Sequence, residues 1–342
     1  MKMSIRNLIA GIGGAICLAI SGNLFAGTLN GAGATFPAPL YQQWISEYSK
    51  VSGGVKINYQ AVGSGAGLAQ IRAKTVDFGA SDEPLKKEDL DKDGMIQFPL
   101  AMGAIVPVVN LPDIKPGELK FSGPVLVKIF MGKITSWADP EITRINEGLK
   151  LPDTKITMVH RADGSGTTWN FTNYLSKVSE EWSGKYGCAK EIAWFEGSVG
   201  GRGNSGVAAM VKKIKGSVGY VESAYAFESK MTYTQMLNKS GKFVKPCDES
   251  FQAAAENADW KNAPGFYMVL TDQAGEKSWP IMASTYILIY KNQPDKEKIG
   301  SLTKFFTWSY DSGTGIAKKL NYVPMPKNVS DLVKETWKNE IK

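Results

Sequence analysis

Short stretches of this chain alternate between apolar and polar residues, and longer ones repeat with a helical period. Residues 55–61 alternate with a period of two, which predicts a half-buried strand. In the ranges 171–178 and 207–214, apolar residues recur every three or four positions, which predicts an amphipathic helix in each. The range 155–159 predicts a strand before the first of these helices.

Further along, the C-terminal ranges 302–306 and 333–341 show the same helical spacing. Strands that alternate with helices indicate an α/β architecture with largely parallel sheets. Two longer apolar runs, 96–110 and 279–291, predict long strands. These strands either cross between two lobes or belong to two sequential domains that meet near residue 151, and the pattern alone leaves both arrangements open.

Residues 1–26 have the layout of a secretory signal peptide. Lys2 and Arg6 supply positive charge, no charged residue follows up to Ala26, and Ala26 is a small residue at the expected cleavage position. An uncleaved membrane anchor is the alternative, but the apolar core is short and rich in glycine. We therefore expect cleavage and an exported mature protein.

Composition and charge indicate a globular protein and limit the kinds of ligand that it can bind. The 342 residues leave room for about two domains, and 43% hydrophobic with 21% charged residues is ordinary for a globular chain. The 40 basic and 33 acidic residues give a formal charge of +7. This mild excess suits small anions and is too diluted by acidic residues to indicate nucleic acid.

In an exported protein, the number of cysteines indicates whether a disulfide can form. After cleavage only Cys188 and Cys247 remain, an even number in an oxidising compartment, so we expect a disulfide between them. Two unpaired buried thiols are the alternative. Two cysteines without CxxC spacing and a single histidine, His160, make a poor ligand set, so no metal site is expected.

The predicted starts of helices share a chemical character. The ranges 31–39, 63–67 and 161–168 are rich in glycine and hydroxyl-bearing residues, and each leads into a helical pattern. Free N–H groups and the positive end of the helix dipole form an anion site at such a start. Taken singly, each range is equally explained by ordinary glycine turns and serine or threonine caps.

Charged residues beside these starts add to the anion hypothesis. Arg161 ends a predicted strand, where its planar guanidinium can bind an oxyanion, and Asp163 can hold that guanidinium in place. The alternative is an isolated surface ion pair. Asp82 follows a short apolar strand and belongs either to the site or to the N-cap of the helix that follows it.

The sequence lacks the common nucleotide-binding and serine-hydrolase motifs. It contains neither GxxxxGK[ST] nor GxSxG, and no GxGxxG follows a strand with a downstream acid. Ser64 and Ser165 lie in glycine turns, but His160 is the only histidine that could serve as their base. On a strand, His160 and Arg161 point to opposite faces, so we expect His160 to be structural or exposed.

Four motifs, in this order, resemble the anion-binding segments of the periplasmic phosphate-binding proteins of Pst-type ABC importers. They are GAGATFPAP at 31–39, YQAVGSGAG at 59–67, VDFGASD at 76–82 and RADGSGTT at 161–168. The segment GYVESAYA at 219–226 and the strand at 279–291 also resemble segments of that family, so the resemblance covers essentially the whole mature chain.

The resemblance implies a set of ligand contacts. Asp82 would accept the proton of phosphate, and Asp163 would hold Arg161 in place. Gly65 stands where the family often has a second serine, and His160 where a second arginine is common. The phosphate-binding residues implied on this chain are Thr35, Phe36, Ser64, Asp82, Arg161, Ser165, Gly166 and Thr167.

The resemblance also implies an α/β, two-lobed periplasmic binding protein fold (type II-like), in which each lobe is a mixed sheet flanked by helices and a two-stranded hinge joins the lobes. One lobe would comprise 27–103 and 282–342, and the other 104–281. The implied function is phosphate binding in the periplasm and delivery to the permease subunits of an ABC importer, by a monomer without a cofactor. The alternatives are a binding protein for another tetrahedral oxyanion, such as sulfate, or a phosphatase.

Overall fold

The computed structural model describes residues 27–342. The predicted signal peptide, residues 1–26, lies outside the described residues. Across the range that the structure describes, no helix combines the length and the apolar character needed to cross a bilayer.

The strands are short except for two in the middle of the sheet. In chain order they are β1 (Thr28–Gly33), β2 (Lys56–Ala61), β3 (Phe78–Ser81), β4 (Met95–Val109), β5 (Lys120–Phe121), β6 (Thr157–Arg161), β7 (Val199–Gly201), β8 (Ser217–Glu222), β9 (Thr232–Tyr233), β10 (Gln235–Leu237), β11 (Phe243–Val244), β12 (Met282–Tyr290) and β13 (Val323–Pro324).

The helices lie between these strands. In chain order they are α1 (Ala38–Ser49), α2 (Ser64–Arg72), α3 (Lys87–Asp93), α4 (Gly123–Phe130), α5 (Pro140–Ile145), α6 (Gly166–Val178), α7 (Glu180–Lys185), α8 (Gly203–Lys213), α9 (Ser223–Glu228), α10 (Asp248–Ala255), the 3₁₀ turns η1 (Trp260–Asn262) and η2 (Pro264–Phe266), α11 (Lys296–Asp311), α12 (Thr314–Lys319) and α13 (Lys327–Glu340).

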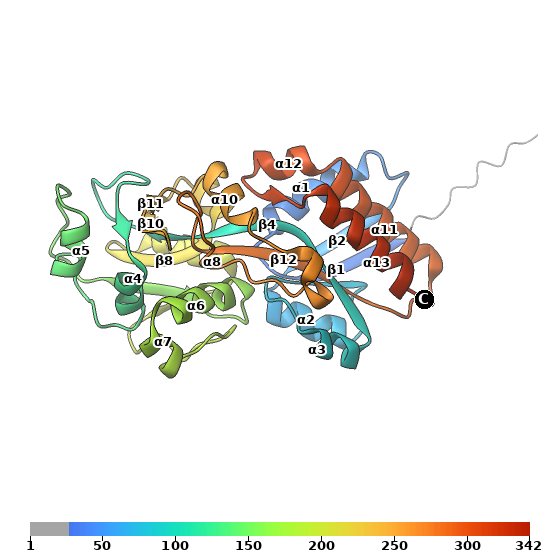
Figure 1. Ribbon diagram of the computed structural model, residues 1–342, viewed down its shortest axis with the longest axis horizontal. Coiled ribbons are helices and arrows are strands. Elements are labelled where there is room, and N and C mark those ends of the chain that lie inside the picture. The colour runs from blue at the N-terminus through green and yellow to red at the C-terminus, as the bar shows by residue number, and fades with distance from the viewer. Residues whose placement is uncertain (1–26) are drawn as a thin grey trace, which may run out of the picture.

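One sheet path runs through the molecule in the order β2-β1-β3-β12-β4-β8-β6-β7, and β9 and β13 also pair with β4. Residues 95–104 of β4 pair with β12, whereas residues 105–109 pair with β8. In Figure 1, β4 and β12 run between one half that contains α1, α2, α3, α11 and α13 and another that contains α4 to α8. The long strand β4 therefore links the two halves.

The sheet is mixed rather than largely parallel. The flanks β2-β1-β3 and β8-β6-β7 are parallel, as the alternation of strands and helices predicts. In the middle, β12 pairs antiparallel with both β3 and β4, and β4 pairs antiparallel with β8. The expectation of parallel sheets is wrong there because the alternation describes consecutive units, whereas β12 enters the sheet from a distant part of the sequence.

Other predicted elements are confirmed with small changes at their ends. The predicted run 96–110 corresponds to β4 (Met95–Val109), and every residue of β4 is buried. The run 279–291 forms the shorter β12, since Pro280 lacks the N–H that a ladder needs. Helix α1 buries Leu40, Trp44 and Tyr48 on one face, as their spacing predicts.

Helix α2 packs unusually closely on the sheet, and a glycine makes this contact possible. A Cβ atom on Gly67 would lie 2.3 Å from Cα of Gly33 and 2.7 Å from the carbonyl oxygen of Ala32, both backbone atoms of β1. Backbone atoms at such distances leave no room for a methyl group. The absence of a side chain at Gly67 therefore sets how close the start of α2 lies to the end of β1.

Replacing Gly67 with alanine is expected to lower the free energy of unfolding by about 1–3 kcal/mol, because the methyl group forces α2 away from β1. The measurement is the midpoint of urea unfolding. Gly300 is the matched control, because it lies inside α11 with open space where a methyl group would stand. Gly300→Ala is expected to raise stability by about 0.4–1 kcal/mol. Equal midpoints for Gly67→Ala and the wild type would contradict this packing argument.

Candidate functional site

The predicted site residues follow strands that end at a common edge of the structure. Thr35 comes just after β1, Asp82 directly follows β3, and Arg161 is the last residue of β6. Ligand sites of α/β sheets form at the carboxyl ends of strands, where helices begin. The predicted residues are all buried: Thr35, Phe36, Ser64, Asp82, Arg161, Ser165, Gly166 and Thr167.

Ser64 joins segments that are far apart in the sequence. It is the first residue of α2, and Gly63 before it adopts a positive φ of 98°. The Ser64 hydroxyl oxygen accepts the backbone N–H groups of Asp82 at 3.2 Å and of Gly166 at 3.1 Å. The backbone N–H of Gly65 donates to the carbonyl of Gly164 at 2.9 Å. These contacts bring the starts of α2 and α6 together.

Asp82 is the most unusual group in this cluster. Its side chain is buried, and the structure shows no hydrogen-bond partner for Oδ1 among the described residues. Oδ2 lies 3.5 Å from the Ser64 hydroxyl, which donates to it. Asp82 does not cap the next helix, since α3 begins at Lys87 with Lys86 in the N-cap position. The N-cap alternative for Asp82 is therefore wrong, and its free oxygen still requires a donor.

The surroundings of Asp82 raise its pKa. Burial raises the pKa of the carboxyl group to about 7, although the neighbouring Thr285 hydroxyl, the charge of Arg161 and the Ser64 hydroxyl act in the opposite direction. An O–H group of a ligand that donates to the ionised carboxylate would satisfy Oδ1. Asp82 is thus suited to a ligand that has an O–H group.

Arg161 and Asp163 form a buried, two-point ion pair. Nε of Arg161 donates to Oδ1 of Asp163 at 2.8 Å, and Nη2 donates to Oδ2 at 2.6 Å. Nη1 donates to the Thr167 hydroxyl at 3.3 Å. Burial raises the pKa of Asp163, but the hydrogen bonds and charge of Arg161 outweigh it, so its pKa lies below the usual value. Asp163 therefore stays ionised and orients the guanidinium, which excludes the interpretation as an exposed surface pair.

Asn204 is a site residue that the sequence analysis missed. Its side-chain amide donates to the hydroxyls of Thr35 at 2.8 Å and Thr167 at 3.3 Å, which come from opposite halves of the molecule. Asn204 lies in the first turn of α8, in the run GNSG. That run has the same glycine-rich and polar composition as the other helix starts. Composition alone could therefore have marked Asn204 as a candidate site residue.

Two further residues hold the backbone of the cluster. The hydroxyl of Tyr225 donates to the carbonyl of Thr35 at 2.6 Å. The side-chain amide of Asn170 donates to the carbonyls of Asp82 at 2.6 Å and Gly166 at 3.0 Å. The bonds to Thr35 and Asp82 each connect segments separated by more than 80 residues. Sequence spacing carries no signal for contacts of this kind.

Ser165 and Gly166 occupy the start of α6. Ser165 is the N-cap, and its hydroxyl oxygen accepts the N–H of Thr168 at 3.0 Å. This bond leaves the hydroxyl proton of Ser165 available as a donor. Gly166 has no room for a side chain, since a Cβ atom there would lie 2.5 Å from the Ser64 hydroxyl and 2.8 Å from Asp82. The start of α6 thus lies directly against Ser64 and Asp82.

His160 is not placed to act as a base. Its Nδ1 lies 2.8 Å from the carbonyl oxygen of Arg161, and its ring stacks on Trp194 with 5.2 Å between ring centres. Burial lowers the pKa of His160 below its usual value. The prediction that His160 is structural is therefore confirmed. Neither Ser64 nor Ser165 has a histidine beside its hydroxyl in the hydrogen bonds described above.

The predicted disulfide between Cys188 and Cys247 is wrong, because both cysteines are free. The Cys188 thiol donates to the carbonyl of Trp169 at 3.2 Å, and burial raises its pKa to about 11. Cys247 is the exposed N-cap residue of α10 and contacts Ser250. An even count in an oxidising compartment permits a disulfide, but pairing also requires the fold to bring both sulfur atoms together.

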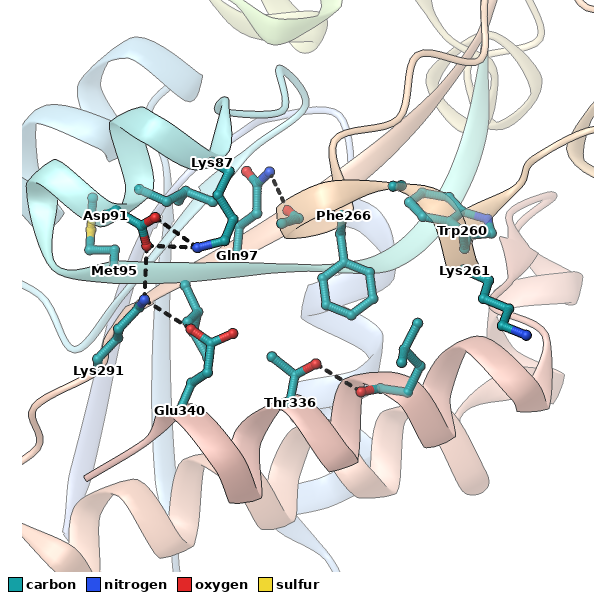
Figure 2. A pocket seen from close by; sticks show the side chains of 15 residues that line it. Lys87, Asp91, Met95, Gln97, Trp260, Lys261, Phe266, Lys291, Thr336 and Glu340 are labelled. Carbon is teal, nitrogen blue, oxygen red and sulfur yellow. Dashed lines mark hydrogen bonds and ion pairs between the residues drawn. The ribbon is translucent and has the colours of Figure 1, made fainter.

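A cavity of about 170 Å³ lies away from this cluster, between α3, η2 and α13. Figure 2 shows the chain of ion pairs along it, from Lys87 to Asp91, Lys291 and Glu340. None of the predicted phosphate-binding residues lines this cavity. Among the described residues, no group of three or more His, Cys, Asp or Glu side chains could hold a metal ion.

Hydrogen-bonding groups from both halves of the fold meet beside a buried carboxyl group whose Oδ1 has no partner among the described residues, an arrangement that is typical of a binding protein for a small polar solute. The PBP superfamily domain matches residues 22–312. The phosphate-binding protein PstS of Xylella fastidiosa is 51% identical over 314 residues, which cover 92% of this chain and 86% of that protein. PstS of Haemophilus influenzae is 49% identical over 317 residues, covering 93% and 94%. This chain therefore belongs to the PstS family of the PBP superfamily.

Solved structures share the fold at lower identity. A human phosphate binding apolipoprotein has a TM-score of 0.73 at 20% identity, covering 90% of this chain and 94% of that one. The phosphate binding protein from Stenotrophomonas maltophilia has a TM-score of 0.69 at 20% identity, covering 91% and 94%. The prediction of an α/β, two-lobed binding-protein fold is therefore confirmed.

Proposed function

We propose that this protein binds inorganic phosphate between its two lobes and delivers it to an ABC importer. The observation that carries the proposal is the buried Oδ1 of Asp82, which has no partner among the described residues, within a cluster of donors. Phosphate keeps at least one proton near neutral pH, by analogy with phosphate groups whose second pKa is about 6. That proton gives the carboxyl group the partner that it needs.

The remaining groups suit the charged oxygens of the same ligand. Arg161 offers a planar, permanently charged donor, and Asp163 holds it in orientation. Thr35, Ser64 and Thr167 add hydroxyl groups to this cluster. N–H groups at the starts of α2 and α6 supply further donors and the positive ends of two helix dipoles. We assign phosphate contacts to Thr35, Phe36, Ser64, Asp82, Arg161, Ser165, Gly166 and Thr167.

The names of the relatives support the transport role. PstS of Xylella fastidiosa and of Haemophilus influenzae are both named phosphate-binding proteins. We further propose that the protein is a periplasmic monomer, that residues 1–26 are removed on export, and that it docks on the permease subunits of the importer. We assign 27–103 with 282–342 to one lobe and 104–281 to the other, and this boundary lies within one residue of the point where β4 changes partners from β12 to β8.

The alternatives explain fewer observations. A phosphatase needs an activated nucleophile, but Ser64 accepts two backbone N–H groups and His160 bonds to a carbonyl. A sulfate-binding protein would place a ligand without a proton against Asp82, and two oxygen lone pairs would then face each other. The position of Asp82 therefore favours phosphate.

Titration of the purified protein with inorganic phosphate is expected to show one bound ion per chain and a fall in the radius of gyration. The lobes close because Ser64 and Gly166, from opposite halves, converge only in the closed arrangement. Calorimetry measures the binding, and small-angle scattering of the same samples measures the closure. Sulfate at equal concentration is the control and should change neither quantity. An unchanged radius with phosphate bound would contradict closure, and no heat of binding would contradict the function.

A further inference from the structure

A buried glutamate lies where the two halves of the sheet meet. Glu222 is the last residue of β8 and pairs with Ile105 of β4, next to the point where Ala104 pairs with Met282 of β12. Its side chain is 0% exposed. Its backbone N–H donates to the side-chain oxygen of Asn204 at 2.9 Å. Glu222 therefore lies at the hinge, and Asn204 connects it to the cluster of proposed phosphate-binding residues.

The carboxyl group of Glu222 is connected to that cluster through a tyrosine. The hydroxyl of Tyr322 lies 2.9 Å from Oε2 of Glu222 and 2.7 Å from the carbonyl oxygen of Phe36. Tyr322 is also fully buried, and its ring packs edge-on against that of Phe36. The other carboxyl bonds come from the Ser223 hydroxyl at 2.7 Å and the N–H of Ala224 at 2.9 Å.

The number of available protons indicates which group donates in each hydrogen bond between Glu222, Tyr322 and Phe36. A tyrosine hydroxyl has one proton, so it can donate to only one of its two oxygen neighbours. The carbonyl of Phe36 has no proton to give, whereas the carboxyl group of Glu222 can carry one. Both short contacts are satisfied when Glu222 donates to Tyr322 and Tyr322 donates to Phe36.

These bonds fix the orientation of the turn that precedes α1. The carbonyl of Thr35 and the N–H of Phe36 belong to one planar peptide group and point in opposite directions. Tyr225 holds that carbonyl at 2.6 Å, and Tyr322 holds the next carbonyl, that of Phe36. Fixing both carbonyl groups sets where the N–H of Phe36 points, and this N–H is one of the proposed phosphate donors.

We propose that Glu222 and Tyr322 form a proton-bearing latch at the hinge, which positions the Thr35–Phe36 turn for phosphate and makes phosphate affinity fall at high pH. The proposal rests on the proposed function. Glu222 is a positioning residue here, since it acts through Tyr322 and the backbone of Phe36 rather than on the ligand.

The surroundings favour the protonated form in the closed protein. Burial raises the pKa of Glu222 to about 8, against the effect of bonding to Ser223, Tyr322 and Ala224, and the charge of Glu228 raises it further. From β4 and α8, Ile105 and Asn204 face it without charge. The titratable groups that face it are Tyr322 from the segment before β13, and Tyr225 and Glu228 from α9.

The sign of the pH effect follows from where the proton is bound. A pKa that is higher in the closed state than in the open one means that closing takes up a proton. Closure is therefore favoured at low pH and is weakened as the pH rises through about 8. Once Glu222 is ionised, it accepts the only proton of Tyr322, and the buried carbonyl of Phe36 loses its donor.

The test is calorimetric measurement of phosphate affinity between pH 6 and 9 for the wild type, Glu222→Gln and Tyr322→Phe. The amide nitrogen that Glu222→Gln introduces can donate to Tyr322 at every pH, but it then faces the N–H of Ala224, which donates to Oε2 in the wild type. The comparison therefore uses the change of affinity with pH in each protein and not the affinity at a single pH. Between pH 6 and about 8 the wild type should lose up to about tenfold more affinity per pH unit than Glu222→Gln, and above about pH 8 the two profiles should run parallel. Comparing the two profiles removes the titration of phosphate and Asp82, which both proteins share.

Tyr322→Phe removes the hydroxyl group that links Glu222 to the carbonyl of Phe36, and it is expected to weaken phosphate binding by roughly 5- to 10-fold at pH 7. Tyr310→Phe is its control, because it also removes a buried tyrosine–carbonyl bond, to Pro99, without touching Phe36 or Glu222. It should bind like the wild type. Superimposable pH profiles for the wild type and Glu222→Gln would overturn the latch even if Tyr322→Phe failed to fold. A folded wild type that binds no phosphate at any pH would instead refute the proposed function.

Discussion

Replacing Arg161 with lysine is expected to weaken phosphate binding by roughly 5- to 150-fold, or about 1–3 kcal/mol. Arg161 uses two nitrogens on Asp163 and a third on Thr167, and its planar geometry allows these bonds to form together. Lysine keeps the charge but concentrates it on one ammonium group. That group cannot hold both carboxyl oxygens of Asp163 and also face the anion with a fixed orientation.

The measurement is the dissociation constant for phosphate by calorimetry, with thermal unfolding to verify that the variant is folded. Arg202→Lys is the matched control, since Arg202 is exposed, precedes α8 and lies near the same carboxylate. We expect Arg202→Lys to bind within about twofold of the wild type, because exposed charges contribute little. An unchanged dissociation constant for Arg161→Lys would remove Arg161 from the site.

Asp82→Asn is expected to remove the discrimination between phosphate and sulfate. In the wild type, sulfate brings no proton, so its oxygen would face the buried Oδ1 of Asp82 without a donor between them. Such contacts cost several kcal/mol for the wrong ligand. An asparagine amide can turn an N–H toward sulfate, so the variant should bind sulfate more tightly than the wild type does, most clearly above pH 7, where Asp82 is ionised.

The pH dependence of sulfate binding separates this explanation from simple loss of charge. Because burial raises the pKa of Asp82 to about 7, the wild type must take up a proton to accept sulfate. Any weak binding of sulfate by the wild type should therefore strengthen as the pH falls below 7, by up to about tenfold per unit. Asp82→Asn has no such proton to take up, so its sulfate affinity should change less steeply with pH than that of the wild type.

Glu83→Gln is the control for this experiment. Glu83 adjoins Asp82 and pairs with Lys190 at 2.6 Å, so the substitution removes a negative charge beside the site without changing the proposed contact. It should still reject sulfate. If Asp82→Asn also rejects sulfate and keeps its phosphate affinity, then selectivity comes from the geometry of the other donors and Asp82 has no part in it.

By itself, the sequence predicted several of the local elements, and its motifs supplied the candidate site residues. Periodicity and long apolar runs indicated elements such as β4 and β12, because the burial of one face or of a whole strand requires apolar residues at regular or consecutive positions. The glycine-rich helix starts identified Ser64 and Ser165, since the need for small residues and free N–H groups is also local.

Only the tertiary structure decided how these segments meet. Ser64 contacts Gly166 across 102 positions, and Tyr322 contacts Phe36 across 286. Glu222 and Tyr322 escaped the sequence analysis, and the expected disulfide is absent, for the same reason. Contacts between distant residues depend on the order in which strands enter the sheet, above all on the return of β12 beside β4. That order is set by the packing of the whole chain, which no local pattern records.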